Sequence, residues 1–305
     1  MITLNKINKV KKIDFLNNMH YDAFFHGKAI DDRTRFVIGE IVTPKVYTIS
    51  FNKDNLLISI NGDEVKLLKF HEHAIFKTAK KILVDSTSLD FPELLYLLYA
   101  LNSTTQDICI TVIYIEPESY TKKDSIMEED DEFNLSEGMS NFSGLPLFSI
   151  NNRQNNKEKN ILLSFLGFEN SRLGQILESD DGATFGKLLA FVAVPAYQPG
   201  WENNSLRKHL SYFEQFKTDL MLYPGNNPYD VIKKLTKIYS AYSNIVIAAI
   251  GTKPSTLASA IFLANNVKNN SIDQQIGTIY DYPIKSKDRS VGVGCISLYE
   301  LNKSI

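Results

Sequence analysis

The sequence has little cysteine and no long apolar run, and each shortage excludes a class of protein. Its 305 residues include two cysteines, Cys109 and Cys295, too few for a disulfide-rich secreted domain. No apolar stretch approaches the roughly 20 residues of a membrane-spanning helix, and the N-terminus lacks a signal-peptide core. The formal net charge of −2 gives no general attraction to duplex nucleic acid. We therefore expect a cytoplasmic protein without a membrane segment.

Metal and nucleophile motifs are scarce as well. Cys109 and Cys295 each lie in an apolar, strand-like run, so we expect buried thiols and not a metal site or a nucleophile. His71 and His73 are two residues apart, with no third metal ligand nearby in the sequence. No G-x-S-x-G motif of a serine hydrolase is present. The sequence predicts no metal site and identifies no cofactor.

The composition is that of a globular protein with a large core. Hydrophobic residues make up 44% of the chain and charged residues 22%, which suits one large domain or two of medium size. Apolar runs typical of strands alternate with helical patterns, which favours a parallel, doubly wound sheet. We predict an α/β fold with a Rossmann-like, mostly parallel sheet, in two successive α/β halves. The main predicted strands cover residues 81–84, 108–115, 161–166, 188–194, 245–250, 276–280 and 292–298.

Changes in composition predict four segments. Residues 1–44 form an irregular or helical extension, with a short amphipathic helix at Lys6–Asn18, and residues 45–121 form the first Rossmann-like half. Residues 122–159 form an acidic mobile loop or linker, because five consecutive acidic residues begin at Glu128. This acidic run could repel or gate an anionic ligand, or it could simply be solvated. Residues 160–305 form the second half.

The most informative local pattern is a strand, a tight turn and a helix after Asn244. The apolar run Ile245–Ile250 stops at Gly251, and Pro254 suits the first turn of a helix, where its missing N–H costs nothing. A helix N-terminus beside Lys253 favours an anionic ligand. The alternative is an ordinary connection with a surface lysine.

Polar residues follow several predicted strands directly. In a parallel sheet such strand ends meet at one rim, where ligands bind, so we expect these residues to converge. The predicted catalytic carboxylates are Asp85, Glu116 and Glu118, should the protein be an enzyme. The predicted ligand-binding residues are Ser86, Thr87, Tyr120, Gly167, Trp201, Gly251, Thr252, Lys253 and Ser255.

Each group also has a structural alternative. Asp85, Ser86 and Thr87 could cap the helix that begins near Phe91. Glu116 and Glu118 could lie in a solvated loop. Trp201 could fill a structural gap instead of stacking on a base.

At Gly251-Thr252-Lys253 the chain resembles the CRISPR-associated Rossmann-fold (CARF-like) nucleotide sensors and related Rossmannoid proteins of bacterial antiviral loci. Their motif is Gly-Gly-Thr-Lys before a helix of small residues; here Ile250 replaces the first glycine, and Ala258, Ser259 and Ala260 follow. Residues 82–89 and 114–120 are also similar to Rossmann-like proteins encoded near defence genes. The match covers about 25 residues. It implies a nucleotide at the sheet rim, contacted by Thr252 and Lys253.

Three functions follow from these features. The first is a nucleotide-binding component of an antiphage defence system, acting as a sensor or accessory subunit through a protein partner or as a homo-oligomer. The second is an enzyme that hydrolyses a nucleotide, as a nucleotide hydrolase or N-glycosidase, with a carboxylate at the rim. The third is a partner-binding scaffold without a ligand.

Overall fold

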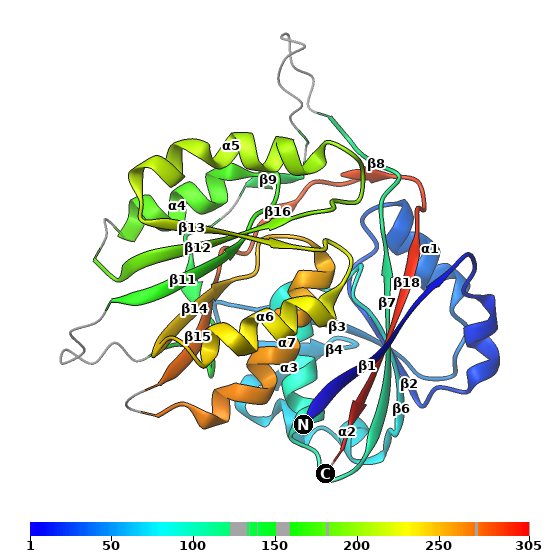
Figure 1. Cartoon of the computed structure of the whole chain (residues 1–305). Helices are drawn as coiled ribbons and strands as arrows, with labels where there is room; N and C mark the ends of the chain where they lie inside the picture. The colour runs from blue at the N-terminus through cyan, green and yellow to red at the C-terminus, as the bar shows by residue number, and fades with distance from the viewer. Residues whose placement is uncertain are drawn as a thin grey trace. The chain divides into compact units, whose positions relative to one another are not determined.

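The chain folds into two compact units, shown in the computed structural model of Figure 1. The first unit comprises Met1–Thr121 and Ser286–Ile305, and the second comprises Lys122–Lys285. The structure describes residues 1–122, 133, 135–138, 140–150, 159–180, 183–271 and 274–304. The α/β class predicted from the sequence is confirmed.

The first unit contains an eight-stranded mixed sheet in the order β1-β18-β7-β6-β2-β3-β4-β5. Pairing is parallel from β3 through β2 and β6 to β7, and antiparallel at both ends of the sheet. The strands are β1 (Ile2–Val10), β2 (Ala23–His26), β3 (Val46–Asn52), β4 (Leu57–Ile60), β5 (Asp63–Lys66), β6 (Lys81–Asp85), β7 (Ile108–Ile115) and β18 (Ile296–Lys303). The helices are α1 (Asp32–Glu40), α2 (Ala74–Thr78) and α3 (Phe91–Asn102), with 3-10 segments at Asp14–Met19 and Leu67–Glu72. A short ribbon pairs β8 (Ser119–Tyr120) with β17 (Ser290–Val291).

The second unit is built on a six-stranded sheet in the order β10-β15-β14-β11-β12-β13. Its strands from β15 to β13 are all parallel, and β10 joins β15 antiparallel. Figure 1 shows α4 and α5 on one face of this sheet and α6 and α7 on the other, as right-handed crossovers in opposite directions require. The strands are β10 (Ser143–Gly144), β11 (Asn160–Phe165), β12 (Phe185–Ala193), β13 (Thr218–Tyr223), β14 (Asn244–Ala248) and β15 (Gln275–Tyr280). The helices are α4 (Asn170–Asp180), α5 (Trp201–Gln215), α6 (Pro228–Tyr239) and α7 (Lys253–Asn266), with a 3-10 turn at Val267–Asn269; β9 (Ser136–Gly138) pairs with β16 (Ile284–Lys285).

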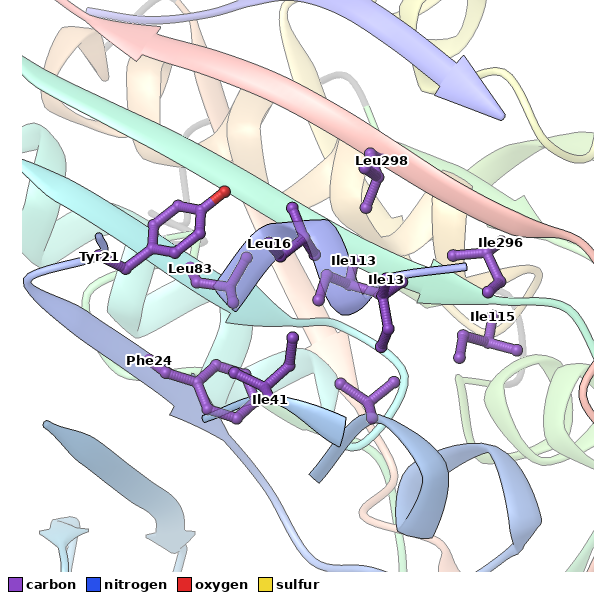
Figure 2. Close-up of a cluster of buried hydrophobic side chains, with 11 residues drawn as sticks. Ile13, Leu16, Tyr21, Phe24, Ile41, Leu83, Ile113, Ile115, Ile296 and Leu298 are labelled. Carbon is purple, nitrogen blue, oxygen red and sulfur yellow. The ribbon is translucent and has the colours of Figure 1, made fainter. Parts of the chain in front are cut away.

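The prediction of an N-terminal extension is wrong. Residues 2–10 form β1, where a helix was predicted from Lys6, and β1 pairs along its length with the C-terminal strand β18. Figure 2 shows Ile13 and Leu16, which follow β1, inside a buried hydrophobic cluster with Leu83 and Ile113. Apolar residues at these positions give up water contact by packing on the sheet, which makes residues 1–44 an integral part of the first unit.

Two other boundaries also differ from the prediction. The predicted second half extends to residue 305, but β18 lies between β1 and β7 in the first sheet, so that sheet is mixed and not mostly parallel. The acidic residues 128–132 of the predicted loop lie outside the described residues. Within the same predicted loop, however, β9 pairs with β16 and β10 pairs with β15. Leu145 and Phe148, also in this segment, are fully buried. Those residues belong to the core of the second unit.

The prediction of two buried thiols is also wrong. Cys109 is exposed and Cys295 is partly exposed. Cys109 alternates along β7 with the buried residues Ile108 and Ile110, so its side chain points to the opposite face of the sheet. Apolar neighbours in a strand bury only the residues that share their face.

Candidate functional site

The strand order of the second sheet reverses between β11 and β14. From β11 the chain moves through β12 to β13 on one side, and then through β14 to β15 on the other. In open α/β sheets the carboxyl ends of the two strands at such a reversal flank the usual ligand position. The loops there contain Gly167 after β11 and Gly251 after β14. Two predicted segments therefore do meet, at the reversal point of one sheet.

The two glycines let these loops pack directly on each other. A Cβ atom on Gly167 would lie 2.9 Å from the carbonyl oxygen of Ile250, and one on Gly251 would lie 2.8 Å from the Cβ of Phe165. Neither glycine has a left-handed backbone conformation. Glycine is needed here for close approach, whereas the sequence had suggested a turn that needs its flexibility.

Replacing Gly251 by alanine is expected to lower the free energy of unfolding by about 1–3 kcal/mol, because the backbone of Phe165 would have to shift. Gly39, in α1, is a matched control, since a Cβ there meets no atom within 4 Å. Its alanine variant should be as stable as the wild type or more so, because alanine favours helix. Urea unfolding measures both, and equal stabilities of the two variants would contradict the packing argument.

Thr252 and Ser255 form the N-terminal cap of α7. The Thr252 hydroxyl donates to the carbonyl oxygen of Gly225 at 2.9 Å and accepts from the Ser255 amide at 3.3 Å. Ser255 is fully buried and donates to the carbonyl oxygen of Thr252. The phenol of Tyr223 lies 3.5 Å from each hydroxyl. These hydroxyls thus have structural roles. Lys253 is the first residue of α7 and places a cation at the same helix end.

Trp201 begins α5 and lies in an aromatic cluster. Its ring meets Phe168 edge-on at 5.3 Å between centroids and Phe133 at 5.7 Å. Gly200 precedes it with a left-handed φ of 88°, a conformation that glycine adopts without strain. This placement fits the structural alternative for Trp201, because its edge-on contacts are those of packed aromatic side chains.

A buried ion pair that the sequence did not indicate lies at the carboxyl ends of the strands of the second sheet. Arg172, in the first turn of α4, donates two hydrogen bonds of 2.6 Å to Asp281, which follows β15 and is fully buried. Burial alone would lower the pKa of Arg172, but Asp281 raises it above its ordinary value. The pair fixes the start of α4 to the end of β15.

In the first sheet, the loop after β6 is buried. Asp85 is inaccessible and accepts a 2.9 Å hydrogen bond from the Thr87 amide. The Ser86 hydroxyl donates to the carbonyl oxygen of Ile113, and the Thr87 hydroxyl accepts from the Ile115 amide. These contacts join the loop to β7, so the polar side chains stabilise the fold where the sequence suggested ligand contacts or a helix cap.

Glu116, another predicted carboxylate, has a perturbed environment. It is 9% exposed, and its Oε1 has no hydrogen-bond partner among the described residues. Burial raises the pKa of Glu116, and the charge of Lys9 offsets this only in part.

Glu118 is exposed, and Tyr120 lies in β8. The predicted single rim is wrong in one respect, since Asp85 and Glu116 follow strands of the first sheet and Gly167 and Lys253 follow strands of the second.

Replacing Glu116 by glutamine is expected to raise the melting temperature at pH 7. Because the folded-state pKa is raised, the stability of the wild type is greatest below the unfolded pKa of about 4.3 and falls as pH rises through the folded pKa. The glutamine variant should not lose stability in this way as pH rises. Its higher melting temperature relative to the wild type should therefore disappear in acid. Circular dichroism melts across pH measure the effect, with exposed Glu118→Gln as a control expected to behave like the wild type. A Glu116→Gln variant less stable than the wild type at pH 7 would contradict this.

A second buried network was also missed, although a local signal for it exists. Asp31 and Thr34 form a capping box at the start of α1, a pattern readable in the sequence. The adjacent Arg33 is buried and donates to Asp31 at 2.8 Å and to Ser290 at 2.9 Å. Ser290 lies far away in the chain, so its part in the network could come only from the tertiary structure.

Comparisons of the chain with protein-family models, curated proteins and solved structures give no match. Within the described part of the chain, no helix is long and apolar enough to cross a membrane. Among the same residues, no group of three or more potential metal ligands comes together.

Proposed function

We propose that the second unit is a Rossmann-like domain that binds a nucleotide or a similar phosphate-bearing molecule at the carboxyl ends of β11 and β14. The observation that supports this most is the strand order β13-β12-β11-β14-β15, with its reversal between two glycine-containing loops. Helix α7 begins at this point with Lys253, which puts a partial positive charge and a cation beside one rim.

The resemblance at Gly251-Thr252-Lys253 adds a biological setting to the proposal. It suggests a sensor or accessory subunit of an antiphage defence system, whose response to a bound nucleotide passes to a protein partner. Thr252 would contribute by holding the α7 terminus in place, because its hydroxyl joins Gly225 to the first turn of the helix.

The proposal predicts that a nucleotide raises the melting temperature of the purified protein. A ligand that binds only the folded state stabilises it by about 2.7 kcal/mol at a concentration of one hundred times its dissociation constant. A thermal-shift screen would test mono-, di-, cyclic oligo- and dinucleotides, and the same mixtures would be analysed for ligand breakdown. Lys253→Ala should abolish the shift, whereas Lys268→Ala, beyond the other end of α7, should preserve it. No shift with any nucleotide would contradict the proposal.

The enzyme hypothesis has one observation in its favour, the raised pKa of the buried Glu116. A raised pKa suits a general acid near neutral pH. Breakdown of a nucleotide that is lost in Glu116→Gln, with the fold intact, would support this second function. Turnover retained by that variant would exclude Glu116 as the catalytic carboxylate.

A further inference from the structure

Strand β13 lies at one edge of the second sheet, and most of its side chains are apolar. Its sequence Thr-Asp-Leu-Met-Leu-Tyr has one charged residue, Asp219, which forms an ion pair with Lys187. Leu220 is 51% exposed and Leu222 is 57% exposed. Proteins commonly protect edge strands with charged side chains, because free backbone N–H and C=O groups otherwise pair with another chain.

The other long edges differ from β13. In the first sheet β1 exposes Lys6 and Lys9, and β5 consists of Asp63, Glu64, Val65 and Lys66. Both edges therefore carry the charges that discourage strand addition. Among the long edge strands of the described chain, β13 alone presents two exposed leucines, and its one charged residue, Asp219, is paired with Lys187.

A basic groove lies beside this edge, between β13 and α6. Its volume is about 560 Å³, enough for several side chains. Its lining includes the apolar Met221, Ile238 and Ala241, and it carries three lysines, Lys233, Lys234 and Lys237, against one acidic residue, Asp230. No acidic side chain of the described residues forms an ion pair with any of these three lysines.

The lysines repel one another, and an anionic partner would relieve this. Lys233 and Lys237 are one helical turn apart, where like charges destabilise a helix. Their positions along the helix axis differ by about 6 Å, and alternate residues of a strand differ by about 6.7 Å. A strand added to β13 could thus bring carboxylates at alternate positions to both lysines.

The opposite side of the same added strand would be apolar. Register with β12 places Leu220 and Leu222 on the face of Ala190 and Val192, where α4 and α5 pack, and Met221 on the α6 face. Side chains of an added strand alternate in the same way. Its apolar residues would cover the two exposed leucines while its acidic residues faced the lysines.

We propose that β13 and the α6 groove bind an extended segment of a partner protein in which acidic and apolar residues alternate. The segment adds to the second sheet as a further strand through backbone hydrogen bonds, and the lysines of α6 select its charge. This interaction is independent of the proposed nucleotide site, because it uses neither β11, β14 nor Lys253.

A defined peptide tests the proposal directly. The probe is a fluorescein-labelled peptide with alternating glutamate and valine, and its binding to the full chain is followed by fluorescence anisotropy. We expect binding that weakens as salt rises, and weaker binding of two controls. One control has lysine in place of glutamate, and the other has the same composition with glutamates and valines in separate blocks.

Variants on the protein assign the binding to this groove. Lys233→Glu combined with Lys237→Glu should weaken binding at least about tenfold, because it replaces attraction by like-charge repulsion. Thr236→Glu puts the same residue on the exposed side of the same helix, outside the groove, and should bind like the wild type. Leu222→Lys should also weaken binding, because it removes one of the two exposed leucines of β13 that the added strand would cover.

Several results would overturn the proposal. They are no binding of the alternating peptide by the wild type, equal binding of the lysine peptide, and undiminished binding by the double charge reversal. Sedimentation velocity gives a further test. A wild-type dimer that becomes a monomer in Leu222→Lys would show that a second copy of the chain occupies this edge instead of an acidic segment.

Discussion

Replacing Arg172 by methionine is expected to lower the free energy of unfolding of the second unit by about 3–5 kcal/mol, because Asp281 would remain as a buried, unpaired charge. Asp281 is fully buried, and its carboxylate accepts both hydrogen bonds from the guanidinium group. Trp201 is the only tryptophan of the chain and lies in this unit, so its fluorescence during urea unfolding reports the change.

Two further variants separate the cost of the lone charge from the cost of lost packing. Removing both charges with Arg172→Met and Asp281→Leu should recover most of the stability, since an apolar pair can replace a buried ion pair at little cost. Lys187→Met breaks the more exposed pair with Asp219 and should cost at most about 1 kcal/mol. A double variant as unstable as Arg172→Met alone would show that packing, and not charge, dominates.

Replacing Asp31 by asparagine is expected to destabilise the first unit by about 3–5 kcal/mol at pH 7, because Arg33 would lose its buried counter-charge. Asp31 is fully buried and accepts hydrogen bonds from Arg33 at 2.8 Å, from the Ser290 hydroxyl at 2.7 Å and from the Thr34 amide at 3.1 Å. Asp32→Asn is the matched control, because that neighbouring carboxylate is at the surface and should matter little. Urea unfolding followed by far-UV circular dichroism compares the two.

The loss in Asp31→Asn should depend on pH in a defined direction. Burial alone would raise the pKa of Asp31, but Arg33, Ser290 and Thr34 together lower it below its usual range. Its stabilising effect is therefore complete above the unfolded pKa of about 3.9 and is lost as pH falls toward the folded value. The gap in stability between wild type and variant should narrow below about pH 4. A gap that widens in acid would contradict this account.

Much of the fold was predictable from local patterns. The run Ile245–Ile250, Gly251 and Pro254 carry their signals within a few residues, and β14 and α7 form where these signals predict them. Strand β7 and helix α3 were predictable for the same reason. Hydrophobic periodicity and capping depend on neighbours in the sequence, so they can be recognised without knowing the fold.

The sequence by itself determined the α/β class, most of the buried strands, and the strand-turn-helix at Gly251. Only the tertiary structure decided that β18 returns to pair with β1, where Ile2 lies opposite Lys303, and that β13 is an edge. It also decided that Arg172 meets Asp281 and that Arg33 meets Ser290. Sheet membership and buried ion pairs join residues far apart in the chain, and no local pattern contains information about such partners.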